Sequence, residues 1–112
     1  MIKCFRDDKG WRRADVGSLP KIIESFLEQD IQNSVSSCDE YLAIGRDVTS
    51  GKQKNWSGTG NAHLVVIDPE KILIENIWDE NVSKATLTHS EFCECLTAWK
   101  DFLERDGEKR VP

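Results

Sequence analysis

The sequence contains no long apolar run, and this absence excludes two classes of protein. The longest run without a polar residue, residues 64–67, is far shorter than the roughly 20 apolar residues of a membrane-spanning helix. Residues 1–6 also lack the extended apolar segment of a secretion signal. We therefore expect no membrane partner, no export and, by default, a cytoplasmic location.

Histidine is scarce, and the four cysteines do not follow a metal-binding pattern. Only Cys93 and Cys95 lie close together, and at about 100° per residue they would point about 200° apart on a helix. Neither His63 nor His89 stands at a zinc-finger spacing from them. We predict no metal site and no cofactor, and we interpret the cysteines as reduced packing residues.

Recognisable catalytic motifs are missing as well. No G-x-S-x-G nucleophile motif occurs, and no serine, threonine or cysteine forms a known local signature with a histidine. Gly58 and Gly60 lack the third glycine of a dinucleotide fingerprint, which makes a flexible loop the better interpretation. We predict a protein without catalytic residues; the alternative is a small enzyme that uses His63 with nearby acids.

The length and composition are those of one ordinary globular domain. The 112 residues allow one modest hydrophobic core, and the 38% hydrophobic and 31% charged fractions lie near globular averages. We predict a single domain over residues 1–112. Gly107 is the expected stop of the last helix, and residues 107–112 are expected to form a frayed C-terminal tail.

Two short segments near the N-terminus, residues 2–7 and 11–16, predict a β-hairpin. Gly10 can adopt the positive φ angle that a tight connection between them requires. A helix is predicted to open at Ser18 or the glycine before it and to end near Asp30, because apolar residues recur there at helical spacing.

The middle of the chain holds a capping signal and then a polar stretch. Residues 37–40, Ser-Cys-Asp-Glu, match the S-x-x-E capping box and predict a second helix to about Ser50. Residues 51–60 are polar and glycine-rich without an apolar period, so we predict an exposed loop there.

A second hairpin gives the clearest strand signal. Residues 62–67 and 72–78 are rich in β-forming residues and are separated by a turn that contains Pro69. If Ile67 faces Ile72, one face of the hairpin is apolar and the other becomes polar toward its open end. The other predicted pairs are Val66 with Leu73, Val65 with Ile74, Leu64 with Glu75 and His63 with Asn76.

The last helix has the strongest periodic signal of the chain. Thr88 and Glu91 form a T-x-x-E capping box, and residues 86–87 before it have the composition of a short strand. Apolar side chains then recur at helical spacing, so this helix must pack on the sheet. The side chains of this stripe are Phe92, Cys95, Leu96, Trp99 and Leu103.

Together these elements predict an α+β fold. The order is ββααββα, with three helices and an antiparallel sheet of about four strands supplied by the two hairpins. Short antiparallel connections take the place of the right-handed crossovers that a parallel sheet requires. The helices are expected to cover one face of the sheet.

Negative charge is concentrated toward the C-terminus. The net charge is −5; residues 68–106 hold ten acidic and four basic residues, whereas residues 1–67 hold nine of each. We predict an acidic face that suits a basic protein partner, because surface charge steers association. The same charge opposes binding to a phosphate backbone, so nucleic acid is not an expected partner. The predicted partner-binding residues are Glu75, Trp78, Asp79, Glu80, Glu91 and Glu94.

Parts of the chain resemble the YacL-type family of small acidic bacterial proteins in layout and spacing. These parts are residues 2–7 (Ile-Lys-Cys-Phe-Arg-Asp), residues 56–63 (Trp-Ser-Gly-Thr-Gly-Asn-Ala-His), the hairpin around Asp68, and the final Phe92-x-x-x-Leu96-x-x-Trp99-x-x-Phe102. That family has no assigned activity, so the resemblance implies no catalytic residues. In size, charge and class the chain is also similar to the immunity proteins of bacterial contact-dependent growth inhibition, which inhibit cognate toxins.

From the residues and the second resemblance we expect a non-enzymatic, protein-binding inhibitor. In this hypothesis an immunity protein occludes the basic active site of a cognate toxin, for example a nuclease. The acidic side chains would supply complementary charge, and Trp78 would supply an apolar anchor. A housekeeping bacterial protein with an unknown binding role is the first alternative.

Overall fold

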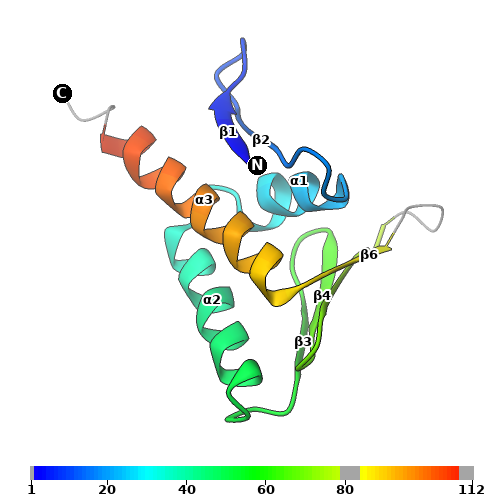
Figure 1. The fold of residues 1–112 in the computed structure, drawn as a ribbon. Helices are drawn as coiled ribbons and strands as arrows, with labels where there is room; N and C mark the ends of the chain where they lie inside the picture. The colour runs from blue at the N-terminus through cyan, green and yellow to red at the C-terminus, as the bar shows by residue number, and fades with distance from the viewer. Residues whose placement is uncertain (1, 79–83, 109–112) are drawn as a thin grey trace.

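The computed structural model describes residues 2–78 and 84–108, and it has the predicted α+β class and element order (Figure 1). Its strands are β1 (Lys3–Arg6), β2 (Arg12–Asp15), β3 (Trp56–Thr59), β4 (His63–Ile67), β5 (Ile72–Asn76) and β6 (Lys84–Leu87). Its helices are α1 (Ile22–Phe26), the π-helical turn η1 (Leu27–Ile31), α2 (Val35–Thr49) and α3 (His89–Glu108).

The strands form two separate antiparallel sheets rather than one sheet of about four strands. β1 and β2 form a two-stranded sheet, and the other sheet has the order β3-β4-β5-β6. The three α-helices lie on one side of the four-stranded sheet, and the N-terminal hairpin projects at one end of the molecule (Figure 1). Within these described residues, no helix combines the length and apolarity that a membrane span requires.

The predicted register of the second hairpin is confirmed. β4 and β5 pair from Ile67 opposite Ile72 to His63 opposite Asn76. The side chains of Ile67 and Ile72 have no exposed surface, because they point toward the helices and join the core. The alternating pattern of apolar residues therefore set both the pairing and the buried face.

The prediction of an exposed loop over residues 51–60 is wrong in its second half. Residues 56–59 form β3, in which Trp56 lies opposite Ile67 and Gly58 opposite Val65. The Trp56 ring packs edge-on against Tyr41 of α2, with 5.5 Å between the ring centroids. This tertiary contact outweighs the poor strand propensity of the surrounding serine and glycine residues.

The first predicted helix is shorter than expected and changes its geometry. Residues 17–18 form a turn, residue 19 lies in a bend, and α1 begins only at Ile22. After one α-helical turn the chain widens into η1, where the N–H of Gln32 donates to the carbonyl oxygen of Leu27, 2.8 Å away. Gln32 then ends the helix with a φ angle of +55°, a backbone conformation that non-glycine residues seldom adopt.

The capping box predicted at residues 37–40 is wrong, because α2 begins earlier. Ser34 is the cap, and its hydroxyl accepts a hydrogen bond of 3.1 Å from the N–H of Ser37. Ser34 has extended backbone angles, which suit a residue just before a helix, whereas Ser37 already lies inside the first turn.

The capping box and the apolar stripe of α3 are confirmed. The N–H of Glu91 donates to the Thr88 hydroxyl at 3.0 Å, and the Thr88 N–H donates to the Glu91 carboxylate at 2.9 Å. All five predicted stripe residues are buried. The helix runs through Gly107 to Glu108, so it extends beyond the predicted stop, and residues 109–112 of the predicted tail lie outside the described residues.

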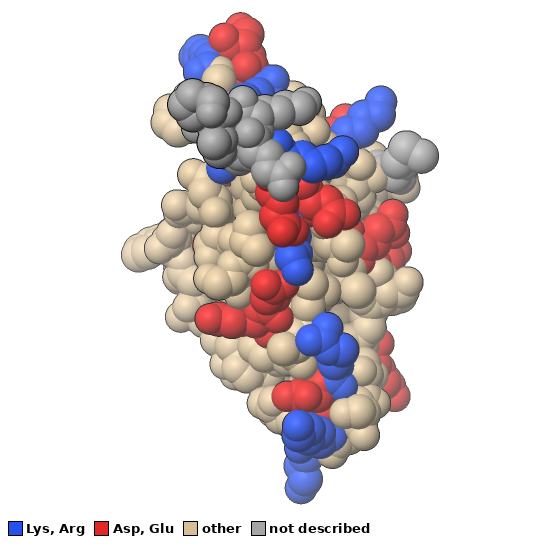
Figure 2. Space-filling view, turned by 90° about the vertical axis from the view of Figure 1, so that its left-hand side faces the viewer, with Lys and Arg blue, Asp and Glu red and all other residues tan. Residues whose placement is uncertain are grey.

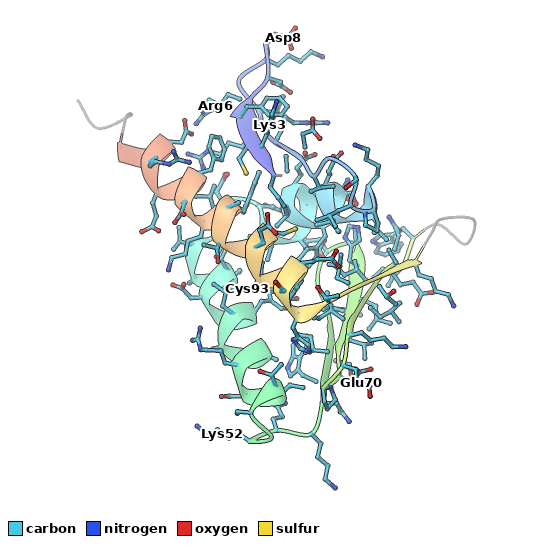
Figure 3. The ribbon with its side chains drawn as sticks, in the orientation of Figure 1. Lys3, Arg6, Asp8, Lys52, Glu70 and Cys93 are labelled. Atoms are coloured by element: carbon cyan, nitrogen blue, oxygen red, sulfur yellow. The ribbon has the colours of Figure 1, made fainter. Side chains whose placement is uncertain are left out.

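One carboxylate joins the N-terminal hairpin to α3. Asp106 accepts from Arg6 on β1, at 2.6 Å, and from Arg12 on β2, at 2.7 Å. Arg6 lies on the side of the hairpin that faces α3, whereas Asp8 lies at its tip (Figure 3). The hydrogen bond from Arg6 is the largest cause that lowers the pKa of Asp106 to about 2.

We predict that this attachment weakens in acid. The folded-state pKa of Asp106 is depressed, so its stabilising effect is complete above about pH 4 and is lost as the pH falls toward about 2. Hydrogen exchange of the β1 and β2 amides, corrected for intrinsic rates, should therefore accelerate in this interval. In Asp106→Asn the exchange should already be fast at pH 5. The exposed Asp101→Asn is the control; equal exchange in the two variants would contradict the prediction.

Candidate functional site

The structure does not gather the predicted partner-binding residues into one patch. Glu75 lies on the face of the sheet opposite the helices, because its neighbour Ile74 is fully buried on the helix side. Glu91 and Glu94 lie on α3, on the other side of the sheet, and Glu91 is engaged in the helix cap. The predicted residues Asp79 and Glu80 lie outside the described residues.

Acidic and basic side chains are interleaved on the face that contains the exposed side of the helices (Figure 2). Lys100 of α3 pairs with Asp39 of α2 at 2.7 Å, and Asp106 is held by two arginines. The excess of acidic residues in the C-terminal part of the sequence therefore does not make this face uniformly negative.

A polar network connects α1, η1 and β4, and we call its three side chains, Ser25, Asp30 and His63, the relay; Ser25 is partly exposed, whereas the other two side chains are buried. His63 Nε2 lies 2.6 Å from Ser25 Oγ, and its Nδ1 lies 3.0 Å from Asp30 Oδ1. His63 is completely buried, and the Asp30 side chain is 3% exposed. Asp30 also accepts from the backbone N–H groups of Ala62 and His63, at 3.0 and 3.1 Å.

The π-helical turn explains why two residues five positions apart can share one histidine. On an α-helix, Ser25 and Asp30 would point about 140° apart, at about 100° per residue. A π turn closes hydrogen bonds five residues apart, so side chains at this spacing come to lie on one face. Ser25 and Asp30 were not among the predicted site residues, since they lie 38 and 33 residues from His63 and no local sequence pattern indicates a π turn.

The relay has the hydrogen-bond order of a serine hydrolase triad, in which an aspartate orients a histidine that activates a serine. Catalysis would also require a substrate to reach the serine and the histidine ring. His63 has no exposed surface, and its ring packs edge-on against Phe26, with 6.0 Å between the centroids. This geometry favours a structural role, in which each polar atom of the relay satisfies another.

An exposed tryptophan lies at the end of β5. Trp78 is 76% exposed and the preceding Ile77 is 43% exposed. Nevertheless, the Trp78 ring is held in place, because its Nε1–H donates to the carbonyl oxygen of Asn61 at 2.7 Å. Its backbone N–H also donates to the Asn76 side chain, at 2.9 Å.

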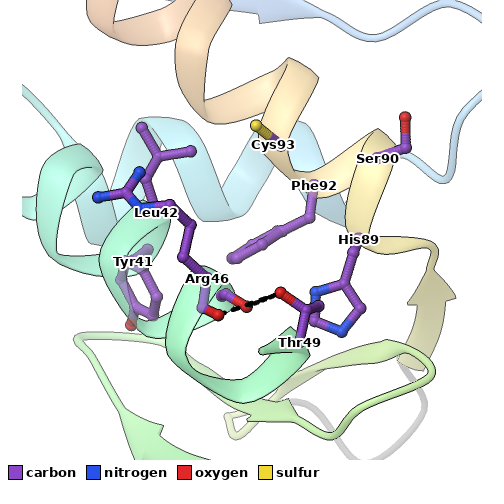
Figure 4. Close-up of a pocket in the computed structure, with 9 residues that line it drawn as sticks. Tyr41, Leu42, Arg46, Thr49, His89, Ser90, Phe92 and Cys93 are labelled. Carbon is purple, nitrogen blue, oxygen red and sulfur yellow. Dashed lines mark hydrogen bonds between the residues drawn. The ribbon is translucent and has the colours of Figure 1, made fainter. Parts of the chain in front are cut away.

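A cavity of about 300 Å³ lies between α2 and the first turns of α3 (Figure 4). This volume is at the lower end of the range of small-molecule sites. Its walls include Tyr41 and Phe92, with Cys93 and Arg46 also among the lining residues. His89 lines it too, and its Nε2 lies 2.7 Å from the carbonyl oxygen of Asp68.

The cysteines are free thiols, and Cys93 and Cys95 lie on different sides of α3, as their spacing predicted. Cys93 is exposed, whereas Cys95 is buried, and burial raises the pKa of the Cys95 thiol to about 12. Within residues 2–78 and 84–108, no three or more His, Cys, Asp and Glu side chains are grouped to hold a metal ion.

Comparisons of the chain with protein-family models, with curated proteins and with solved structures found no match. The resemblances to the YacL-type family and to immunity proteins therefore stay predictions from the sequence.

We predict that Gly45→Ala stabilises the protein. Gly45 lies inside α2, where glycine is less favourable than alanine by about 0.5–1 kcal/mol, and an added Cβ would meet only His89 Nδ1, 4.0 Å away. Urea denaturation should show a gain of about this size. Gly58→Ala is the contrast, because its Cβ would lie 2.6 Å from the Trp56 ring and should destabilise the fold. A loss of stability in Gly45→Ala would contradict the prediction.

Proposed function

We propose that this protein is a non-enzymatic inhibitor of the immunity type, which binds a cognate cationic toxin and covers its basic active site. The observation that carries the proposal is Trp78, which is 76% exposed but held by two hydrogen bonds. The net charge of −5 supports a basic partner over an acidic one.

A fixed and exposed tryptophan suits an interface anchor for two physical reasons. Tryptophan is enriched among the few residues that supply most of the free energy of a protein complex. The Trp78 ring is already ordered by Asn61, so binding would lose less side-chain entropy than with a freely rotating ring. Because its N–H is satisfied within the chain, the ring can offer its apolar faces to a partner.

The outer face of the four-stranded sheet offers a second set of partly exposed apolar side chains. Leu64, Val66 and Leu73 alternate with core residues on β4 and β5, and each is partly exposed. Ile77, which directly follows β5, is 43% exposed. Partly exposed aliphatic side chains and an exposed tryptophan are the residue types found in the apolar centre of an interface, which polar residues usually surround.

Charge around this surface is mixed on the sheet and acidic in the adjoining sequence. Glu75 lies opposite Lys84 in the β5–β6 pair, so the two charges partly compensate. Asp79 and Glu80 directly follow Trp78 in the chain. In the proposed complex these two acids supply the local charge, while Glu94 and the other acids of α3 act at longer range by steering a basic partner.

The experiment compares two exposed tryptophans as anchors. Wild type, Trp78→Ala and Trp11→Ala would be immobilised and exposed to a lysate of the producing cell, and a retained basic protein would be identified and purified. Trp11 is the matched control, since it is 67% exposed but lies on the N-terminal hairpin, between β1 and β2. We expect Trp78→Ala to weaken binding of that protein by at least about 30-fold, which corresponds to about 2 kcal/mol.

A second measurement tests inhibition itself. The retained protein would be assayed for its own activity, such as nuclease cleavage, with and without each variant. Reversal of Glu75, Asp79 and Glu80 to lysine should reduce inhibition and its dependence on ionic strength. Equal inhibition by wild type, Trp78→Ala and the charge-reversed variant would reject this surface, and a retained protein with undiminished activity would reject the inhibitor function.

A further inference from the structure

We propose that the relay is a positioning device that holds Trp78 in its exposed orientation. This inference rests on the proposed binding role of Trp78, but it makes a separate structural claim about the turn between β3 and β4. Ser25, Asp30 and His63 act through that turn, so they are positioning residues and need no contact with a partner.

Asp30 fixes the turn from its buried side. Its carboxylate accepts the backbone N–H groups of Ala62 and His63 in addition to the His63 ring. The turn itself is closed by a hydrogen bond of 2.9 Å from the N–H of Gly60 to the carbonyl oxygen of His63. Two consecutive peptide groups therefore depend on one carboxylate for their position.

The same turn holds Ile77 and Trp78 from its exposed side. The carbonyl oxygen of Asn61 accepts the ring N–H of Trp78 at 2.7 Å, and that of Ala62 accepts the N–H of Ile77 at 2.9 Å. The Asn61 side chain is itself tied to η1, because its Nδ2 donates to the carbonyl oxygen of Gln29 at 3.0 Å. Only residues 61 and 62 separate the buried carboxylate from the exposed ring.

Gly60 shows how closely the turn approaches η1. A Cβ at this position would clash with Asp30 Oδ2 and would lie 2.9 Å from Asp30 Cγ. The clash could not be relieved by rotation of Asp30 alone, because three hydrogen bonds hold its carboxylate. Glycine at position 60 thus permits the turn to lie close to η1, whereas a side chain there would force the two segments apart.

The relay needs a carboxylate, since all three of these donors are N–H groups. Oδ1 accepts from the Ala62 N–H and the His63 ring, and Oδ2 accepts from the His63 N–H. In Asp30→Asn, one of the two terminal groups becomes an NH₂ that faces an N–H donor. A buried donor without an acceptor is costly, so the turn should move away from η1.

The experiment measures hydrogen exchange of the Trp78 ring N–H by NMR in wild type, Asp30→Asn, Gly60→Ala and the control Glu28→Gln. The control makes the same chemical change on η1, but Glu28 accepts from the Ala14 N–H of β2 at 2.8 Å instead. We expect the Trp78 ring N–H to exchange at least about tenfold faster in Asp30→Asn and Gly60→Ala, and within about twofold of wild type in the control.

Exchange of the Ile74 amide in the centre of the sheet separates positioning from general destabilisation. If Asp30→Asn accelerates exchange of Ile74 and of the Trp78 ring by the same factor, the relay only stabilises the fold and the inference is overturned. Unchanged protection of the Trp78 ring in both relay variants also overturns it. Should Asp30→Asn fail to fold, Gly60→Ala and the milder Ser25→Ala provide the same comparison.

The two proposals can fail separately. Binding of the retained partner should weaken by at least about tenfold in Asp30→Asn and remain unchanged in Glu28→Gln. If Trp78→Ala binds like wild type, the proposed docking role is wrong, while the exchange experiment still decides whether the relay positions the ring. If Trp78→Ala loses binding but the relay variants do not, the positioning inference alone is wrong.

Discussion

The structure depends on one buried carboxylate that joins the helical layer to the sheet. Asp30 has little contact with solvent, and a buried ion is stable only when hydrogen bonds replace its water. Its three donors all belong to residues 62 and 63, at the start of β4. Because β4 pairs with both β3 and β5, the position of this strand relative to η1 determines where the rest of the sheet meets the helices.

The elements that the sequence predicted are those defined by short-range patterns. Alternation of apolar residues fixed the β4–β5 register. The α3 stripe and its cap could be predicted because neighbouring members of each pattern lie at most four positions apart. β3 and the relay depend on contacts between distant segments: Trp56 requires Tyr41 as a neighbour, and Ser25 requires the π turn to meet His63. Trp78 was predicted as a partner-binding residue from its residue type and position. The hydrogen bond from its ring to Asn61 could not be predicted from the sequence.

The distribution of charge shows why a count along the chain does not define a surface. Asp106 belongs to the acidic C-terminal stretch, but folding places it against two arginines from the N-terminal hairpin. Glu91 is engaged in a helix cap, and the sheet separates Glu75 from Glu94. Net charge acts over distances of about a Debye length, about 8 Å at physiological salt, whereas specific recognition needs groups at defined positions. The Trp78 ring has such a defined position, whereas the acidic side chains are dispersed over the molecule.

The relay also illustrates that an arrangement of catalytic residue types can have a mechanical role. The hydrogen-bond order of Ser25, His63 and Asp30 satisfies the geometry of a nucleophilic triad, but exposure decides what such a group can do. A hydrolase needs an open path to its nucleophile and histidine, and here the imidazole is enclosed and packed against Phe26. A closed polar network instead restricts motion, because each bond limits the rotation of its neighbours. The segment restricted most directly is the turn that carries Asn61, and through it the exposed face of Trp78.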